Sequence, residues 1–149
     1  MQDFVHLHVH TQYSLLDGQA SVSRLVDKAM KDGMKGIAVT DHGNMFGIKE
    51  FTNYVNKKNS GPKGEIKDLK KRIAGIESGE IECEDKEAEI ADCRAKMAEA
   101  ESKLFKPIVG CEMYVARRTM DKKEGKPDQS GYHLIVLAKN EKGYHNLIK

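Results

Sequence analysis

The sequence has little that suits an exported or membrane-inserted protein. Its three cysteines, Cys83, Cys93 and Cys111, are odd in number and widely spaced, which argues against a disulfide framework and against a zinc knuckle. No apolar run approaches the roughly 18 residues that a membrane span needs. The first ten residues lack a basic start and an apolar signal core. We therefore expect a cytoplasmic protein with reduced thiols and no membrane partner.

An excess of one charge is missing as well. The 149 residues include 25 Lys and Arg and 23 Asp and Glu, which give a formal net charge of +2. This balance excludes a basic tail and a strongly acidic disordered chain. The length predicts about one domain, with roughly 150 residues per domain, and is too short for a complete (β/α)8 barrel of about 200 residues or more.

The charge is concentrated in residues 57–106, where 24 of 50 residues are charged and the net charge is zero. Apolar residues recur there at heptad spacing in two groups, which are Ile66, Leu69, Ile73 and Ile76, and then Ile90, Cys93, Met97, Ala100 and Leu104. We predict an antiparallel helical hairpin inserted at 57–106. A solvated spacer and a partner-binding or DNA-clamping arm both stay open, although the zero net charge argues against phosphate binding.

The other residues alternate between strand and helix patterns. We expect strands over 4–10, 36–40, 107–116 and 132–139, a polar loop over 117–131, and helices from about 21, over 44–56 with Asn44 as N-cap, and from 140. Gly33 is a plausible stop for the first helix. This order predicts an α/β fold with a mainly parallel sheet covered by helices.

Histidines are concentrated near the N-terminus. His6, His8 and His10 would share one face of the first strand, with apolar residues on the other face. A buried imidazole needs a partner at each nitrogen, and three adjacent ones are hard to satisfy without metal or acids. The run therefore indicates a metal site, although a single His-x-His would be weak support.

Other polar residues fall in or after the later strands. Asp41 and His42 follow a buried strand directly, at the end where α/β folds place their sites. Asp41 could also simply cap a turn. Glu112 and His133 lie within apolar strands, where a carboxylate must be paired or coordinated. Imidazole and carboxylate ligands suit zinc, manganese or iron. More than three or four such ligands suggest a multinuclear site that clamps a phosphate and activates water.

These residues lie in stretches that resemble the PHP (polymerase and histidinol phosphatase) superfamily, and more narrowly the PHP domains at the N-terminus of bacterial DNA polymerase III alpha subunits. The stretches are FVHLHVHTQYSLLDG, GIAVTDHGNMFG, KPIVGCEMYVARR and YHLIVLAKNEKGYHNLIK. The resemblance implies a distorted (β/α)7 barrel, of which residues 1–149 would be an N-terminal part with about the first four strands. It also implies up to three zinc or manganese ions.

The resemblance assigns metal ligands to this sequence residue by residue. The matching positions are His8, His10, Asp17, His42, Glu112 and His133. The remaining ligands of the family would lie beyond Lys149. His6 would lie behind the ligands or be a polar residue of the core, with direct ligation as the alternative, and Asp41 would orient His42 or a water molecule. Arg117 and Arg118 could contact a DNA backbone or simply belong to a solvated loop.

Three functions are consistent with this pattern. The first is a metal-dependent 3′–5′ proofreading exonuclease within a DNA polymerase, with DNA and other replicase subunits as partners. The second is a scaffold that docks a proofreading subunit without catalysis of its own. The third is a free-standing PHP phosphoesterase. If the chain is a fragment, we expect it to bind metal weakly, to show little catalysis alone and to self-associate through open sheet edges.

Overall fold

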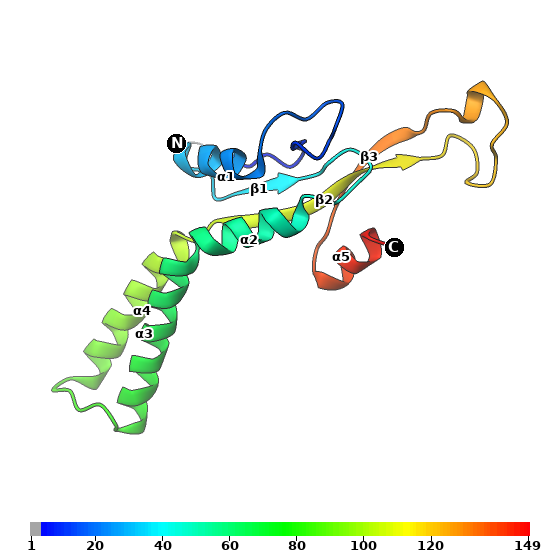
Figure 1. The fold of residues 1–149 in the computed structure, drawn as a ribbon. Helices are drawn as coiled ribbons and strands as arrows, with labels where there is room; N and C mark the ends of the chain where they lie inside the picture. Colours follow the sequence, from blue (N-terminus) through cyan, green and yellow to red (C-terminus); the bar gives the residue numbers. More distant parts are fainter. Residues whose placement is uncertain (1–3) are drawn as a thin grey trace. The chain divides into compact units, whose positions relative to one another are not determined.

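The computed structural model describes residues 4–149, which form two compact units (Figure 1). The first, called the β unit here, contains the described residues up to Tyr54 together with Lys106–Lys149. The second, called the helical unit, contains Val55–Phe105. Within residues 4–149, no helix is both long enough and apolar enough to cross a lipid bilayer.

The β unit contains a sheet in the order β1-β2-β3, formed by Gly36–Val39, Lys106–Val115 and Tyr132–Leu137. β1 and β2 are parallel, whereas β2 and β3 are antiparallel. The expected mainly parallel sheet is therefore correct for β1 and β2 and wrong for β3. The physical reason lies in the connections, because the polar loop after β2 returns the chain as a hairpin, while the long path from β1 to β2 permits a parallel pair.

The predicted first strand over 4–10 does not form as a regular strand. The segment runs beside β1, where Ala38 N donates to His6 O at 2.9 Å and Thr40 N donates to Val9 O at 3.0 Å. The two donors are two residues apart but the acceptors are three apart, so the segment carries one extra residue. Such a bulge interrupts the ladder and the strict alternation of side chains.

The first helix agrees with its prediction. α1 spans Val22–Lys31 and buries Val22, Val26 and Ala29. Gly33 follows with a φ of +79°, which is the left-handed conformation that glycine adopts readily after a helix. The apolar stripe and the stop signal are local features, and they placed this helix correctly.

The second helix begins later than predicted. α2 spans Ile48–Lys58, so Asn44 is not its N-cap. The Asn44 side chain instead donates to the carbonyls of Tyr13 and His42 at 3.0 and 3.1 Å and accepts from Phe46 N at 3.1 Å. Asn44 therefore holds the loop after β1 in place, a role that depends on a segment distant in sequence.

The end of the described chain follows the prediction. α5 spans Glu141–Leu147, and the Asn140 side chain accepts from Gly143 N at 2.9 Å as its N-cap. The loop before β3 contains one short 3-10 turn, Lys126–Asp128.

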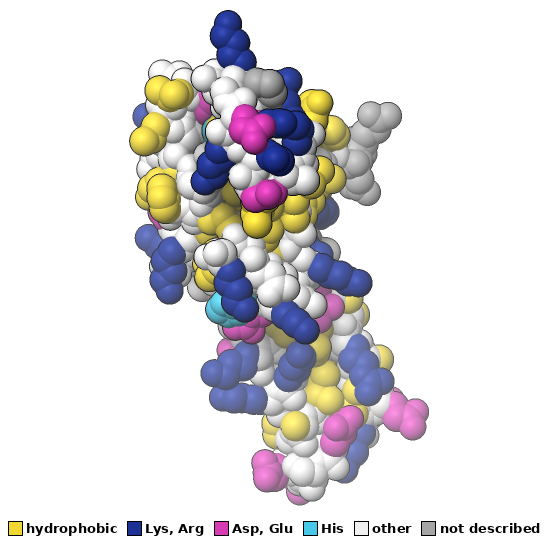
Figure 2. All heavy atoms as spheres, turned by 90° about the vertical axis from the view of Figure 1, so that its right-hand side faces the viewer, with side chains coloured by type: hydrophobic (Ala, Val, Ile, Leu, Met, Phe, Trp, Pro, Cys, Tyr) yellow, Lys and Arg dark blue, Asp and Glu magenta, His cyan; other side chains and the backbone are white. Residues whose placement is uncertain are grey.

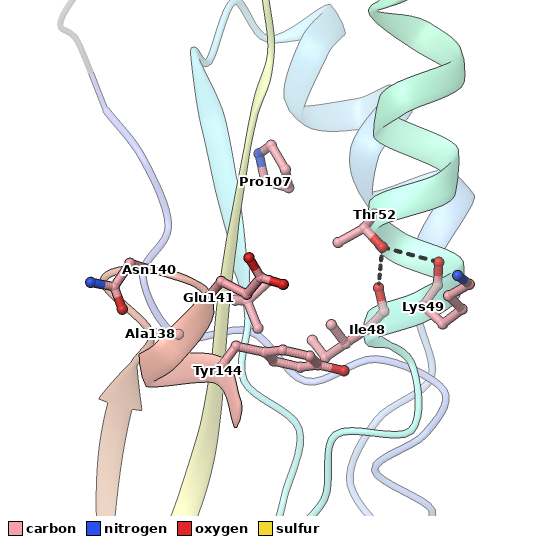
Figure 3. A pocket seen from close by; sticks show the side chains of 9 residues that line it. Ile48, Lys49, Thr52, Pro107, Ala138, Asn140, Glu141 and Tyr144 are labelled. Atoms are coloured by element: carbon pink, nitrogen blue, oxygen red, sulfur yellow. Dashed lines mark hydrogen bonds between the residues drawn. The ribbon is translucent and has the colours of Figure 1, made fainter. Parts of the chain in front are cut away.

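A hollow of about 410 Å³ lies between α2, β2 and the start of α5 (Figure 3). The Thr52 hydroxyl at its wall already donates to the carbonyls of Ile48 and Lys49 at 2.9 and 3.2 Å. None of the predicted site residues lines this hollow. The predicted site residues therefore lie in another part of the β unit.

The helical unit contains α3, Ser60–Ser78, packed on α4, Lys86–Ser102. The two helices expected here are present, and the seam buries Ile76, Cys93 and Ala100. Gly79, with a φ of +82°, ends α3, and the Asp85 side chain accepts from Ala88 N at 3.0 Å to start α4. Figure 2 shows basic and acidic side chains interleaved on the surface, as the neutral composition implies.

One buried side chain connects the residue before α3 to the segment that follows α4. Asn59 is buried, donates from Nδ2 to Phe105 O at 2.8 Å and accepts from Phe105 N at 2.9 Å. This pair of hydrogen bonds joins residues 46 positions apart. It ties the start of α3 to the segment that leaves α4.

Candidate metal centre

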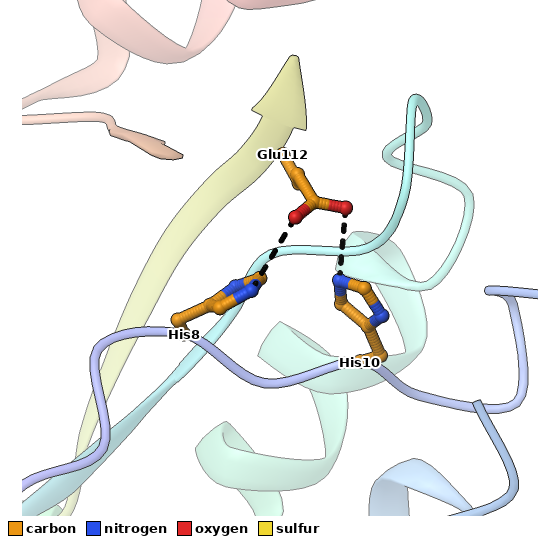
Figure 4. A group of neighbouring side chains, drawn as sticks. All are labelled: His8, His10 and Glu112. Atoms are coloured by element: carbon orange, nitrogen blue, oxygen red, sulfur yellow. Dashed lines mark ion pairs between the residues drawn. The ribbon is translucent and has the colours of Figure 1, made fainter. Parts of the chain in front are cut away.

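A single buried carboxylate lies at the centre of the predicted site. Glu112 on β2 is 7% exposed. Its Oε1 lies 3.4 Å from both His8 Nε2 and His133 Nδ1. Its Oε2 lies 3.2 Å from His10 Nε2 and 2.6 Å from His42 Nδ1. Figure 4 shows His8 and His10 approaching the carboxylate from the N-terminal segment.

The sheet register brings these side chains together. His42 continues the β1–β2 ladder as the parallel partner of Glu112. His133 on β3 is the antiparallel partner of Tyr114. Cross-strand partners share a face, and so do residues two apart on one strand. Glu112, His42 and His133 therefore lie on the same face.

Asp17 reaches the cluster from the loop that follows His10. Its Oδ1 lies 3.2 Å from His10 Nδ1, and its Oδ2 lies 3.5 Å from His42 Nδ1. The loop is a tight turn in which Asp17 N and Gly18 N both donate to Ser14 O, at 3.1 and 2.7 Å. A Cβ at Gly18 would lie 1.8 Å from Thr11 O, so only glycine fits there.

The donor atoms of this cluster suit a divalent cation. Three groups of side chains each bring their ligand atoms within 4.8 Å of one another. The groups are His8, His10 and Glu112, then His10, Asp17 and His42, and then His42, Glu112 and His133. Among residues 4–149, the buried side-chain nitrogen and oxygen atoms without a hydrogen-bond partner are His10 Nε2, His42 Nδ1 and Glu112 Oε2. Leaving such atoms unpaired is costly. A cation between them would satisfy all three, and nitrogen and oxygen ligands suit zinc or manganese.

Threonine 40 orients one of the histidines. His8 Nδ1 lies 2.9 Å from Thr40 Oγ1, and the same hydroxyl accepts from Val9 N at 3.0 Å. With Nδ1 engaged in this way, Nε2 of His8 faces Glu112. A hydrogen bond on the far nitrogen is the usual support of a metal-binding histidine.

Asp41 supports the cluster without belonging to it. Its carboxylate is 1% exposed and accepts from Thr11 N, Thr11 Oγ1 and Ser14 Oγ at 2.6, 2.9 and 2.8 Å. The Ser14 hydroxyl in turn accepts from His42 N at 3.0 Å. Asp41 therefore anchors the loop that carries Asp17 and connects that loop to His42.

His6 is not brought into the cluster. Its ring is exposed and lies edge-on to Phe4, with 4.7 Å between ring centroids. It belongs to none of the three groups found among residues 4–149. The bulge between residues 6 and 9 explains why the three histidines do not share one face.

The two arginines lie in the loop between β2 and β3 and make contacts within it. Arg118 pairs with Asp128 and Glu124, and its guanidinium lowers the pKa of the Asp128 carboxyl. Arg117 donates to Ser130 O at 2.9 Å and lies over the Tyr132 ring at 5.1 Å. Much of the charge of Arg118 is therefore balanced inside the loop.

Several residues of the site were not predicted from the sequence, namely Thr11, Ser14, Thr40 and Tyr114. The sequence did contain a signal for Tyr114, because it lies two residues after Glu112 on one strand and must share its face. Thr11 directly follows the His-x-His. Ser14 and Thr40 had no signal, since their partners lie 27 to 32 residues away.

Comparison with known families identifies the family of the chain. The sequence model described as PHP domain matches residues 6–149. The chain belongs to the PHP domain family. PHP domains are metal-dependent phosphoesterases as a family, and the clusters around Glu112 in this member have the ligand types that such a site requires.

The chain is also similar to bacterial proteins named DNA polymerase III subunit alpha. It is 39% identical over 147 residues to the protein from Borreliella burgdorferi and 38% identical over 146 residues to that from Treponema pallidum. The protein from Aquifex aeolicus is 32% identical over 154 residues. These alignments cover 98%, 97% and 99% of this chain, but the chain spans only about 9% of the length of each relative.

Proposed function

We propose that this PHP domain is the N-terminal part of a replicative DNA polymerase III alpha subunit and that its site is a multinuclear metal centre. The observation that carries this proposal is the convergence of four histidines on the buried Glu112, where three buried side-chain atoms have no hydrogen-bond partner. The reaction that suits such a centre is hydrolysis of a phosphodiester, here as a 3′–5′ proofreading exonuclease. The partners would be DNA and other replicase subunits, in the cytoplasm.

The proposed ligands of zinc or manganese are the six residues His8, His10, Asp17, His42, Glu112 and His133. When bound, such ions polarise a phosphoryl oxygen and activate water for attack. The protein contributes the arrangement of the ligands. Glu112 is positioned by two ladders, and the Asp17 loop is anchored by Asp41.

Contact with the DNA backbone would involve Arg117 rather than Arg118. Among the described residues, Arg117 makes no ion pair, and the Tyr132 ring supports its guanidinium. Arg118 is already paired with two carboxylates. Contacts between a basic side chain and phosphate strengthen DNA binding, and their contribution to the affinity decreases as salt is added.

The test replaces His8 and His10 by Ala in the full-length protein. We expect the zinc or manganese affinity and the chelator-sensitive 3′–5′ nuclease rate to fall by about 100-fold or more, because loss of a mere supporting partner of a ligand already costs about 10–100-fold. The matched control is His145→Ala, because His145 is exposed on α5 and contacts the side chains of Glu141 and Tyr144, outside the proposed ligand set.

Unchanged metal content and nuclease rate in a correctly folded double variant would refute the metal-centre proposal. Loss of metal without any nuclease activity in the parent protein would instead favour the non-catalytic scaffold. Metal analysis and the nuclease assay therefore separate the two functions.

A further inference from the structure

Tyr114 lies beside the cluster, although the proposed function assigns it no role. We propose that Tyr114 is a positioning residue whose hydroxyl holds the imidazole of His42 with Nδ1 turned toward the metal centre. This inference rests on the proposed metal site and specifies how one of its ligands is prepared for binding.

The fold places Tyr114 on the same face as Glu112. It lies two residues further along β2, and its cross-strand partner on β3 is His133. The Tyr114 ring lies edge-on to both His42 and His133, with ring centroids 5.0 and 5.1 Å apart. The ring therefore packs against two proposed ligands at once.

Gly43 leaves the space that this ring occupies. Gly43 has a φ of +64°, and a Cβ built on it would lie 3.0 Å from Tyr114 Cε2. A larger residue would be strained there and would crowd the ring. The backbone directly after His42 is thus compatible with a close approach of Tyr114.

The two nitrogens of His42 face different partners. Nδ1 is buried, lies 2.6 Å from Glu112 Oε2 and has no hydrogen-bond partner among the described residues. Nε2 contacts the Tyr114 hydroxyl. A neutral imidazole carries one N–H, so a lone pair at Nδ1 requires the proton at Nε2. The Tyr114 oxygen accepts a hydrogen bond from that N–H, and its own O–H is free to donate to water because Tyr114 is 56% exposed.

The same arrangement occurs at two neighbouring histidines. His8 has Thr40 Oγ1 on Nδ1 and turns Nε2 toward Glu112. His10 has Asp17 near Nδ1 and also turns Nε2 toward Glu112. In each case a polar group on one nitrogen leaves the other facing the carboxylate. Tyr114 completes this pattern for His42.

The experiment compares Tyr114→Phe, Tyr114→Ala and the control Tyr144→Phe in the full-length protein. Free Mn²⁺ is measured by electron paramagnetic resonance during titration, and the Mn²⁺-dependent rise in melting temperature is measured in parallel. Tyr114→Phe keeps the ring and removes only the hydroxyl. Tyr144 lies on α5 and lines the separate hollow.

We expect Tyr114→Phe to weaken Mn²⁺ binding by about 10-fold, which is the effect of removing such a supporting partner. Its melting temperature without metal should equal that of the parent, and the rise on adding Mn²⁺ should shrink accordingly. Tyr144→Phe should match the parent in both measurements.

Two outcomes would overturn the inference. If Tyr114→Phe binds Mn²⁺ like the parent while Tyr114→Ala does not, the ring packs against the site but the hydroxyl positions nothing. If both variants bind like the parent, Tyr114 has no role in the site.

A failure of the proposed function would look different. If the parent itself binds no Mn²⁺ or zinc, the metal-centre proposal fails, whatever the Tyr114 variants do.

Discussion

Single side chains divide into those that face the centre and those that hold them there. Glu112, His10 and His42 each present a buried side-chain atom that lacks a hydrogen-bond partner within the described chain. Asp41 is the opposite case, because its buried carboxylate accepts three hydrogen bonds from Thr11 and Ser14. These hydrogen bonds give the Asp41 carboxylate a structural role, because a buried polar group is stable when its hydrogen bonds are made.

Replacing Asp41 by Ala should destabilise the β unit. The three donors would be left buried without an acceptor, at a cost of about 1–3 kcal/mol each, so we expect a loss of at least about 3 kcal/mol. Urea unfolding followed by circular dichroism measures it. The control Asp32→Ala removes only an exposed pair with Lys28 and should cost under about 1 kcal/mol. Equal losses in the two variants would contradict the anchoring role of Asp41.

The loop between β2 and β3 should lose an ion pair in acid. Arg118, and then the Glu124 amide, lower the pKa of Asp128 below its ordinary value of 3.8. The depressed pKa means that the pairing stabilises the folded loop at neutral pH and is lost as the pH falls through the lowered value. Carboxyl carbon NMR should give a midpoint below 3.8. Arg118→Gln should move the midpoint back toward the ordinary value, and an unmoved midpoint would show that the Glu124 amide is sufficient.

At the scale of elements, local patterns predicted much of what forms. The stripe of α1, the cap of α5 and the two seams of the helical unit are all present. The failures are equally instructive. The start of α2 was misplaced because Asn44 bonds to Tyr13 O, and the first strand is irregular because of an extra residue beside β1. Neither contact can be predicted from the spacing of nearby residues.

Replacing Ile76 by Ala should destabilise the helical unit. Ile76 is 0% exposed within the seam, and such a truncation typically costs about 2–5 kcal/mol. Hydrogen exchange of amides in α3 and α4 should accelerate accordingly. The control is Lys70→Ala, because Lys70 is exposed on α3. It should change the free energy of unfolding by under about 0.5 kcal/mol. A cost for Ile76→Ala as small as that of the control would mean that the seam contributes little.

At the scale of the molecule, all three candidate ligand groups lie in the β unit. Among the described residues, the helical unit contributes none. Metal binding should therefore stabilise one unit selectively, since a ligand stabilises only the structure that binds it.

Chelation should loosen the β unit and leave the helical unit unchanged. Addition of EDTA to the zinc- or manganese-loaded protein should raise hydrogen exchange around residues 8–18, 40–43 and 110–114. Exchange in α3 and α4 should not change. Faster exchange in both units would show that their stabilities are linked, and unchanged exchange everywhere would contradict a metal centre around Glu112.

The sequence by itself determined which chemical groups are available and which helices form. His8, His10, Asp17, His42, Glu112 and His133 were all found from residue type, spacing and family motifs, and the structure places them in one cluster. Helix stripes and caps depend on residues three or four positions apart, so the sequence contains them directly.

Only the tertiary structure decided how those groups face one another. The antiparallel pairing of β3, the absence of His6 from the cluster, and the contacts of Thr40 and Tyr114 with histidines depend on register between segments far apart in the chain. A ladder displaced by one residue would turn Glu112 or His133 to the opposite face. Such non-local geometry results from packing, which is why the candidate ligands were visible in the sequence while their orientation was not.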